Sequence, residues 1–108
     1  MDQNAQDKRQ AHRVRTETIM HIHTHYIPGM HALPLEDISA NGAFLKSRML
    51  PEVDDTVTAE IFDKKQKKIF SGKATVRRVC RPVNSNKWGF AIEFENEFPM
   101  YVLDYLAK

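Results

Sequence analysis

Residues 88–94 contain the clearest strand pattern in the chain, Trp88-Gly89-Phe90-Ala91-Ile92-Glu93-Phe94. Large apolar side chains occupy every second position, and smaller or charged side chains lie between them. Successive side chains of a β-strand point to opposite faces, so this alternation predicts a strand with one face in the core. The expected inward residues are Trp88, Phe90, Ile92 and Phe94.

The same two-residue period recurs toward the N-terminus. It predicts a strand over residues 14–26, ended by Pro28-Gly29, and another over residues 56–62. The expected inward residues of these two strands are Val14, Thr16, Thr18, Met20, Ile22, Thr24, Tyr26, Val57, Ala59 and Ile61.

Residues 67–81 form a longer candidate strand, in which Phe70, Ala74 and Val76 share one face. Val79 breaks that alternation, which indicates a β-bulge near Arg77-Arg78.

Polar segments separate the candidate strands. Residues 63–66 and 82–86 are rich in turn-forming residues and predict hairpin loops. Residues 31–35 and 43–45 predict two short strands, and Pro34 disfavours a central position for the first. From Phe98 onward apolar residues recur at helical spacing, which predicts a helix over residues 99–107. About six strands and one terminal helix indicate a mainly all-β fold, a six-stranded antiparallel barrel with a short C-terminal α-helix.

Length and composition exclude several classes of protein. The 108 residues suffice for one domain with one hydrophobic core. The longest apolar run, residues 100–103, is far shorter than the roughly 20 residues that a membrane span requires. The polar N-terminus lacks the apolar segment of a secretory signal, and the single Cys80 cannot form an internal disulfide, so a cytoplasmic location is expected. The glycines match neither the Walker nor the Rossmann pattern.

Residues 1–12 contain almost no apolar side chains and predict a flexible N-terminal arm before a domain over residues 13–108. The net charge of +2 is too small to indicate a nucleic-acid partner. It conceals a local excess of positive charge, because residues 8–15 include Lys8, Arg9, Arg13 and Arg15 and no acidic residue. This cluster on a flexible arm suggests that the arm binds an anion.

Two short motifs lie about 24 residues apart. Arg9 and Arg13 form an RxxxR pattern, and Asp37, Ser39 and Gly42 form a DxSxxG pattern. In this order, and in a small barrel, the two motifs resemble those of the PilZ domain, a bacterial receptor domain for cyclic di-GMP. The segments 73–79 and 88–94 resemble the closing strands of that family, and the resemblance extends over roughly residues 8–106.

The resemblance implies that Arg9, Arg13, Asp37, Ser39 and Gly42 contact cyclic di-GMP. The chemistry is suitable, because an arginine can meet the paired O6 and N7 acceptors of guanine or pair with phosphate. An aspartate can accept hydrogen bonds from guanine N–H groups, a serine offers a hydroxyl, and a glycine permits close approach. Further candidate ligand-binding residues are Lys8 and Asn41. The alternative interpretation is a solvated basic arm beside an ordinary turn.

Three histidines, His21, His23 and His25, alternate along the first candidate strand. They would line one face at a spacing of about 7 Å, where neighbours could share a Zn²⁺ or Ni²⁺ ion. His31 or Glu17 could supply a further ligand. We favour the alternative, a polar outer face of the strand, and predict no metal site.

Residues 64–81 carry eight Lys and Arg and no acidic residue. A barrel that binds single-stranded nucleic acid would interleave such charges with exposed aromatic residues, but this run contains only Phe70, which alternation places inward. We therefore expect a solvated hairpin and no DNA or RNA partner. The charges could instead assist phosphate binding or form a docking surface for an acidic partner.

No grouping of nucleophile and base predicts catalysis. Cys80 has no histidine near it in the strand, and Glu93, Glu95 and Glu97 alternate as an exposed strand face. The sequence therefore predicts a non-enzymatic receptor that uses no cofactor besides its ligand, cyclic di-GMP.

Ligand binding is expected to order residues 1–12 over the barrel and to signal to an unidentified partner protein. The resemblance implies an output in motility, pilus function, biofilm formation or virulence. The alternatives are a ligand-free adaptor with the same fold and, with less support, a nucleic-acid-binding barrel.

Overall fold

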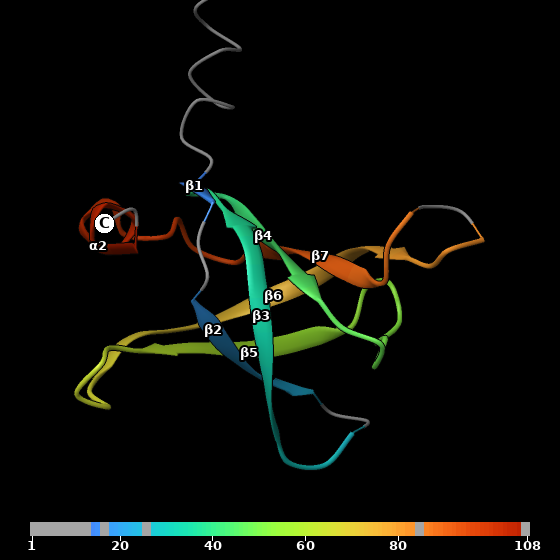
Figure 1. The fold of residues 1–108 in the computed structure, drawn as a ribbon, viewed down its shortest axis with the longest axis horizontal. Helices are drawn as coiled ribbons and strands as arrows, with labels where there is room; N and C mark the ends of the chain where they lie inside the picture. The colour runs from blue at the N-terminus through green and yellow to red at the C-terminus, as the bar shows by residue number, and fades with distance from the viewer. Residues whose placement is uncertain (1–13, 16–17, 25–26, 84–85, 107–108) are drawn as a thin grey trace, which may run out of the picture.

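The computed structural model describes residues 14–15, 18–24, 27–83 and 86–106. Within them the chain forms mostly β-strands, with one short helix near its C-terminal end (Figure 1). The elements are β1 (Val14–Arg15), β2 (Ile19–Thr24), β3 (Met30–Ile38), β4 (Gly42–Lys46), β5 (Thr56–Phe62), β6 (Lys68–Cys80), β7 (Gly89–Phe94) and α2 (Met100–Leu106). The predicted flexible arm, residues 1–12, lies outside the described residues.

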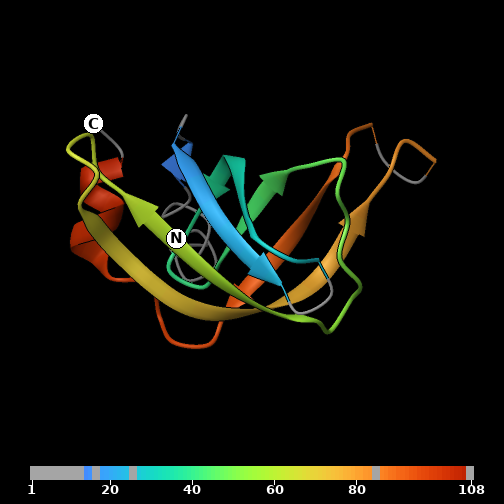
Figure 2. The same ribbon diagram turned by 90° about the horizontal axis from the view of Figure 1, so that it is seen from below.

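The strands form one antiparallel sheet that closes on itself (Figures 1 and 2). Its order is β1-β3-β2-β5-β6-β7-β4, and the additional pairing of β3 with β4 closes the ring. β1 and β2 pair with β3 at successive positions, since Val14 lies opposite Ile38 and Ile19 lies opposite Pro34. Together they fill one place in the ring, so the predicted six-stranded antiparallel barrel is confirmed.

The core contains most of the side chains that the two-residue period predicts to point inward, although Thr18 and Phe70 are only half-buried. The buried members of these predicted faces are Met20, Ile22, Thr24, Val57, Ala59, Ile61, Ala74, Val76, Phe90, Ile92 and Phe94. Removing one large apolar side chain of this kind from water contributes about 1.5–3 kcal/mol. The side chains of Val14, Thr16 and Tyr26 lie outside the described part of the chain.

Trp88 differs from its predicted inward position. It precedes β7 and is only half-buried, and the guanidinium carbon of Arg48 lies 5.4 Å from its ring centroid. The aromatic ring therefore meets a cation at the barrel surface, and the inward stripe of this segment begins at Phe90.

β3 is longer than the predicted strand 31–35 and continues through Pro34 to Ile38. The proline is tolerated because of the direction of its backbone nitrogen. Leu35 N–H donates to Thr18 O at 2.9 Å, on the β2 side, so the nitrogen of the preceding residue points to the other edge. On that edge the pairing with β4 starts only at Leu35, and the N–H that proline lacks is not needed there.

The predicted irregularity of the long strand is confirmed. The register of β6 on β7 shifts between Val76 and Arg78, which marks a bulge at Arg77. Because of this additional residue, Val76 and Val79 can both turn toward the interior.

The predicted C-terminal helix is confirmed as α2 within the described residues. Its buried side chains are Val102, Leu103 and Leu106, which belong to the same hydrophobic cluster as the barrel core. The helix therefore packs against its own barrel. Among the described residues, no helix has the length and apolar character that crossing a membrane requires.

Candidate functional site

The DxSxxG motif lies where β3 turns back into β4. Asp37 still belongs to β3 and Gly42 already belongs to β4, so only residues 39–41 form the turn. Only the middle of the motif is therefore a turn, and its two ends are strand residues. The reason is strand pairing, since Asp37 lies opposite Phe44 of β4 and Gly42 pairs with β7.

The Ser39 side chain holds the turn together. Ser39 N–H donates to Gly42 O at 2.8 Å, and the Ser39 hydroxyl lies 3.4 Å from the same oxygen. The hydroxyl also accepts a hydrogen bond from Asn41 N–H at 3.3 Å. Short polar side chains that bond to nearby backbone in this way stabilise tight turns. Ser39 thus has a structural role, and a hydroxyl has a second acceptor position that a ligand could use.

The turn is also bonded to the last residue of β7 and to the chain that follows it. Asn41 O accepts from Phe94 N–H at 2.8 Å, and Ala40 O accepts from Phe98 N–H at 2.7 Å. The turn is therefore fixed both internally and to the segment that leads into α2. Sequence reasoning missed this connection, because no local pattern near Ala40 points to residues so distant in the chain.

Gly42 is required by the neighbouring strand. A Cβ atom at this position would collide with the carbonyl oxygen of Ile92 in β7. At the other end of the β4–β7 pairing, a Cβ at Gly89 would likewise collide with the carbonyl oxygen of Leu45. Because both obstacles are backbone atoms, β4 and β7 can pair this closely only with glycine at these positions. A role of Gly42 in ligand approach stays a prediction.

β1 places the start of the described chain beside the motif. Val14 lies opposite Ile38 and Arg15 lies opposite Asp37, in antiparallel register. Arg13 is covalently bonded to Val14, so the RxxxR motif leads directly into the strand that pairs with the DxSxxG motif. Lys8, Arg9 and Arg13 themselves lie outside the described residues. Asp37 is half-buried, and Asn41 is exposed.

A cluster on the outer face of the barrel, Glu36, Phe44 and Lys87, lies next to Asp37. Phe44 is buried, but it faces away from the core, because its neighbours in β4 point inward. The Lys87 ammonium lies 4.3 Å from the Phe44 ring centroid and 3.2 Å from a carboxylate oxygen of Glu36. The sequence did not indicate this cluster, since its members come from three separate segments.

The histidines do not gather into a metal site among the described residues. His21 and His23 lie on the outer face of β2, and the His21 ring packs edge-on against Phe62 with centroids 5.1 Å apart. His31 lies opposite the inward-facing Ile22, and side chains of directly paired residues share a face. His31 therefore points inward and cannot join His21 and His23 on the outer face. The hypothesis that His31 adds a ligand is therefore wrong, while His25 and Glu17 lie outside the described residues.

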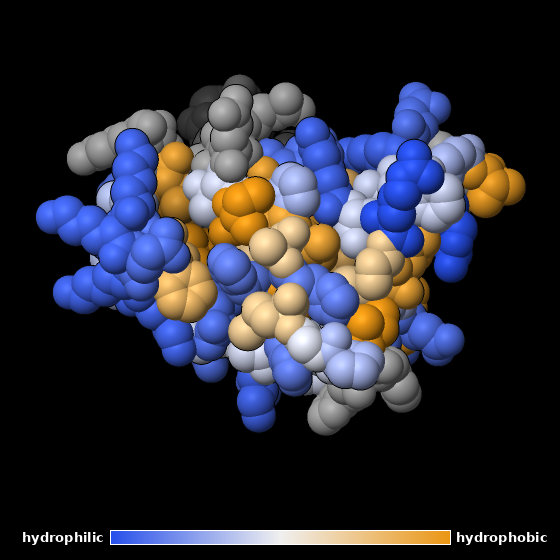
Figure 3. Space-filling view, turned by 60° about the horizontal axis from the view of Figure 1, so that its bottom comes forward, coloured by the Kyte–Doolittle hydropathy of each residue, from blue (hydrophilic) through white to orange (hydrophobic). Residues whose placement is uncertain are grey.

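Nearby carboxylates partly neutralise the basic run. Arg77 Nε lies 2.6 Å from Glu93 and its Nη1 lies 3.5 Å from Asp54, while Lys68 lies 3.1 Å from Glu60. Figure 3 shows hydrophilic side chains gathered at its left side, over the end of the β5–β6 hairpin. These features match the predicted solvated hairpin.

Phe70 packs inward, as alternation predicts for this position of the basic run. Its ring centroid lies 4.3 Å from that of Phe98 and 5.7 Å from that of Phe94. It therefore belongs to an aromatic group beside the core and is not displayed on the outer face for base stacking.

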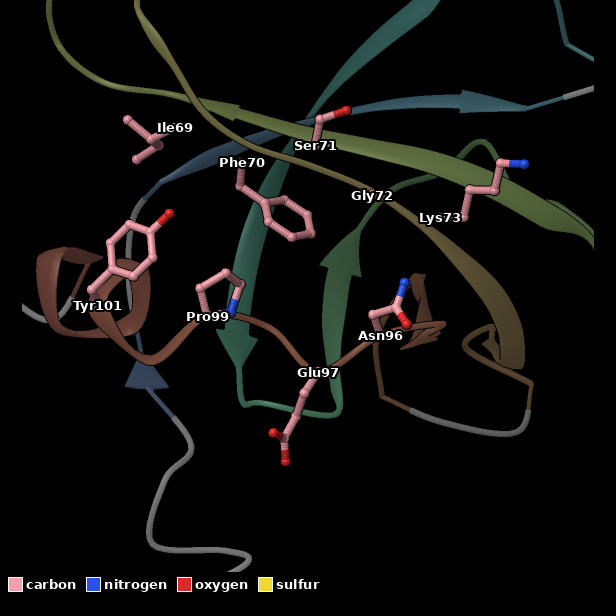
Figure 4. Close-up of a pocket in the computed structure, with 9 residues that line it drawn as sticks. All are labelled: Ile69, Phe70, Ser71, Gly72, Lys73, Asn96, Glu97, Pro99 and Tyr101. Atoms are coloured by element: carbon pink, nitrogen blue, oxygen red, sulfur yellow. The ribbon is translucent and has the colours of Figure 1, made fainter.

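A cleft of about 300 Å³ opens between β6 and the segment that precedes α2 (Figure 4). One wall is residues 69–73 of β6, and the other consists of Asn96, Glu97, Pro99 and Tyr101. The described residues of the DxSxxG motif do not line this cleft. The cleft is therefore a second surface feature, separate from the motif.

Comparison with known proteins indicates one family. The model of the family described as PilZ domain matches residues 7–106. No curated protein matches the chain. A similar solved structure is that of the Bacillus subtilis inhibitor of motility (MotI/DgrA), with a TM-score of 0.60 and 18% sequence identity. The match covers 87% of this chain and 47% of that chain, so this chain spans about half the length of that protein, and the likeness is one of fold.

Proposed function

The chain belongs to the PilZ domain family, and on that premise we propose that it is a receptor for cyclic di-GMP. Proteins of this family act in general as receptors or adaptors rather than as enzymes. The observation that carries the proposal is the register of β1 on β3. It brings the chain directly after the RxxxR motif against Asp37, at the edge of the DxSxxG turn.

Each motif residue has a role in this proposal that suits its chemistry. Arg9 and Arg13 bind the guanine edges or the phosphates, with Lys8 adding charge. Asp37 accepts hydrogen bonds from guanine N–H groups, and Ser39 and Asn41 contribute polar contacts at the turn. The hydrogen bonds that fix the turn support the proposal, because a preorganised site loses less conformational entropy when it binds.

The signal in this proposal is the ordering of the N-terminal arm. Residues 1–12 have almost no apolar side chains that could repay the entropy of ordering. A bound nucleotide neutralises the arginines and holds the arm against the barrel, which creates a new surface for a partner protein. We place this event in the cytoplasm, where the single Cys80 would remain reduced.

Calorimetric titration of the full chain with cyclic di-GMP tests the proposal. We expect binding to the unaltered chain and an affinity at least about tenfold lower for Arg13→Ala, because a bidentate arginine contact is worth about 1–3 kcal/mol. Arg78→Ala is the matched control, since it removes an equal charge from the exposed part of β6. Single-stranded DNA should give only weak, salt-sensitive binding.

Two results would contradict the proposal. Absence of cyclic di-GMP binding by the unaltered chain would exclude the receptor, and unchanged binding by Arg13→Ala would exclude the assigned role of Arg13.

The arm is tested separately by NMR. Amide signals of residues 2–12 that keep random-coil shifts in the nucleotide complex would refute arm ordering.

A ligand-free adaptor is the second candidate, and one observation favours it. Ser39 hydrogen-bonds within the turn, and the absence of a Cβ at Gly42 lets β4 pair closely with β7. Two of the three DxSxxG residues therefore have structural reasons to be present without a ligand. A chain that binds a partner protein and shows no response to cyclic di-GMP would establish this candidate instead.

A further inference from the structure

One edge of β6 is unpaired over part of its length. β6 pairs with β5 over residues 68–75, but it pairs with β7 only from Ala74 onward. The last hydrogen bond on the β7 side joins Glu95 N–H to Lys73 O at 2.8 Å. Before Lys73, no strand in the described part of the chain pairs with this edge.

Alternation along the strand identifies the backbone groups at this edge. Because Lys73 O points to the β7 side, the N–H and C=O of Ser71 point there as well, while those of Phe70 and Gly72 point to β5. Ile69 is the additional residue of a bulge, so the regular part of the edge is short. We call this stretch, residues 70–73 with Ser71 at its centre, the Ser71 edge. Unpaired edges of this kind are templates for a further strand.

The cleft described above runs along the Ser71 edge. Figure 4 shows the Phe70 ring and Pro99 in the middle of the cleft, with Tyr101 at its Ile69 end and Lys73 at the other. Tyr101 is 73% exposed although it is a large aromatic residue. Gly72 leaves room for the Phe70 ring in the cleft, because a Cβ there would lie 2.8 Å from that ring. Backbone hydrogen-bonding groups and an apolar recess thus lie side by side.

The charges around the cleft are mainly positive. Lys64, Lys65 and Lys67 are exposed in the turn beyond one end, and Lys73 is exposed at the other. Within the described chain none of these four lysines has an ion-pair partner, in contrast to Lys68. Glu97 is the one carboxylate in the cleft wall. This arrangement favours a segment with acidic residues at its ends.

We propose that the Ser71 edge binds an extended segment of a partner protein, which joins the barrel as a short additional strand. Its backbone pairs with the N–H and C=O of Ser71, and an apolar side chain enters the cleft over Phe70. Acidic residues on either side of the paired stretch face Lys73 and the lysines of the β5–β6 turn.

The cleft is connected to the DxSxxG turn through Phe98. Its N–H bonds to Ala40 O, and its ring packs against Phe70 in the floor of the cleft. Docking at the Ser71 edge stands on its own, whereas its control by cyclic di-GMP rests on the proposed function. If the nucleotide shifts the turn, Phe98 passes the shift to the cleft.

Amide hydrogen exchange of the uncomplexed full chain tests the edge itself. We expect the Ser71 amide to exchange on the order of 100-fold faster than the amides of Phe70 and Gly72, which bond to β5. Equal protection of the three amides would show that the edge is closed and would overturn the proposal.

Peptide titration followed by NMR tests the occupant. The probe is a short capped peptide with alternating valine and threonine in its centre and aspartates at both ends. We expect shifts confined to residues 69–73 and 96–101, protection of the Ser71 amide, and weaker binding of a peptide with lysines at its ends. Absence of binding at millimolar peptide, equal binding of both peptides, or self-association of the chain through this edge would overturn the proposal.

Three variants make the test specific. Ser71→Pro removes the edge N–H without removing a bond to β5 and should abolish peptide binding, whereas Ser71→Ala keeps the N–H and should bind normally. Tyr101→Ser alters only the exposed wall of the cleft and should weaken binding several-fold. Peptide binding that survives in Ser71→Pro would refute strand addition. Cyclic di-GMP binding, measured in the same variants, should not change, so failure of either proposal is distinguishable from failure of the other.

Discussion

The turn at residues 39–41 and the Ser71 edge differ in how their backbone groups are used. In the turn, the carbonyls of Ala40 and Asn41 accept hydrogen bonds from Phe98 and Phe94. At the Ser71 edge, the backbone N–H and C=O of Ser71 have no strand partner within the described chain. The two conditions arise together, because the chain that follows β7 bonds to the turn and thereby leaves β6. A rigid candidate ligand site and an open candidate docking site are therefore produced by one divergence of the chain.

Phe98→Ala should disrupt both regions and have the largest effect. Phe98 is 2% exposed, and its ring centroid lies 4.3 Å from that of Phe70 and 5.1 Å from that of Phe94. Truncation of a buried phenylalanine costs about 3–5 kcal/mol of unfolding free energy, which urea denaturation measures. Phe98→Leu is the control and should lose less than about 1.5 kcal/mol, because it keeps most of the volume. A loss below about 1 kcal/mol in Phe98→Ala would show that the two regions are not joined by this side chain.

Gly42→Ala should disturb the closed region alone. The added Cβ meets the backbone of Ile92, which can yield only if β4 separates from β7. We expect a loss of about 1–3 kcal/mol in the same urea assay. Gly29→Ala is a control for strain without collision, since Gly29 has a φ of +89° and no atom within 4 Å of the added Cβ. Local exchange protection in β4 should fall in Gly42→Ala only, and an intact β4 in that variant would contradict the collision.

Ser39→Ala should loosen the turn without opening the barrel. It removes the hydroxyl that accepts from Asn41 N–H, a contribution of about 0.5–1.5 kcal/mol. The Asn41 amide should exchange faster, and Ser39→Thr, which restores a hydroxyl, should recover its protection. Unchanged exchange at Asn41 would mean that the hydroxyl does not hold the turn.

Ser71→Ala should have the smallest effect on stability. The Ser71 hydroxyl lies 3.5 Å from a Glu60 carboxylate oxygen, at the limit of hydrogen bonding, and the side chain is exposed. We expect a change below about 0.5 kcal/mol in urea denaturation. If Ser71→Ala lost as much unfolding free energy as Ser39→Ala, the Ser71 side chain would make contacts that its exposed position does not indicate.

The barrel could be predicted from the sequence because its strands alternate cleanly between core and solvent. Residues 56–62 were predicted with the bounds that β5 has, and the break at Val79 revealed the bulge near Arg77. The errors occurred where alternation does not decide the structure. Pro34 suggested an early end to β3, but its nitrogen points to an edge that needs no donor there. Trp88 fits the inward period, yet it lies beyond the end of the strand, beneath Arg48.

The candidate site was only partly predictable. The resemblance implied that Arg13 and Asp37 contact one ligand, and the β1–β3 register places Arg15, two residues after Arg13, opposite Asp37. The motif could not reveal that Gly42 faces Ile92 or that Ala40 O bonds to Phe98, because both depend on how distant strands meet. The cleft was not predicted for the same reason. It exists because the first residues of β6, from Lys68 to Lys73, extend beyond the last residue of β7.

The hydrogen bonds from the turn to Phe94 and Phe98 also set an order of events during synthesis of the chain. The DxSxxG motif leaves the ribosome early. The residues that bond to its turn are translated roughly half a chain later, and so is β7, the strand that pairs with β4 at Gly42. Contacts between segments so distant in sequence form late in folding. A nascent chain that already displays both motifs therefore still lacks the fixed turn. The ligand site that we propose there would be complete only when nearly the whole domain has emerged.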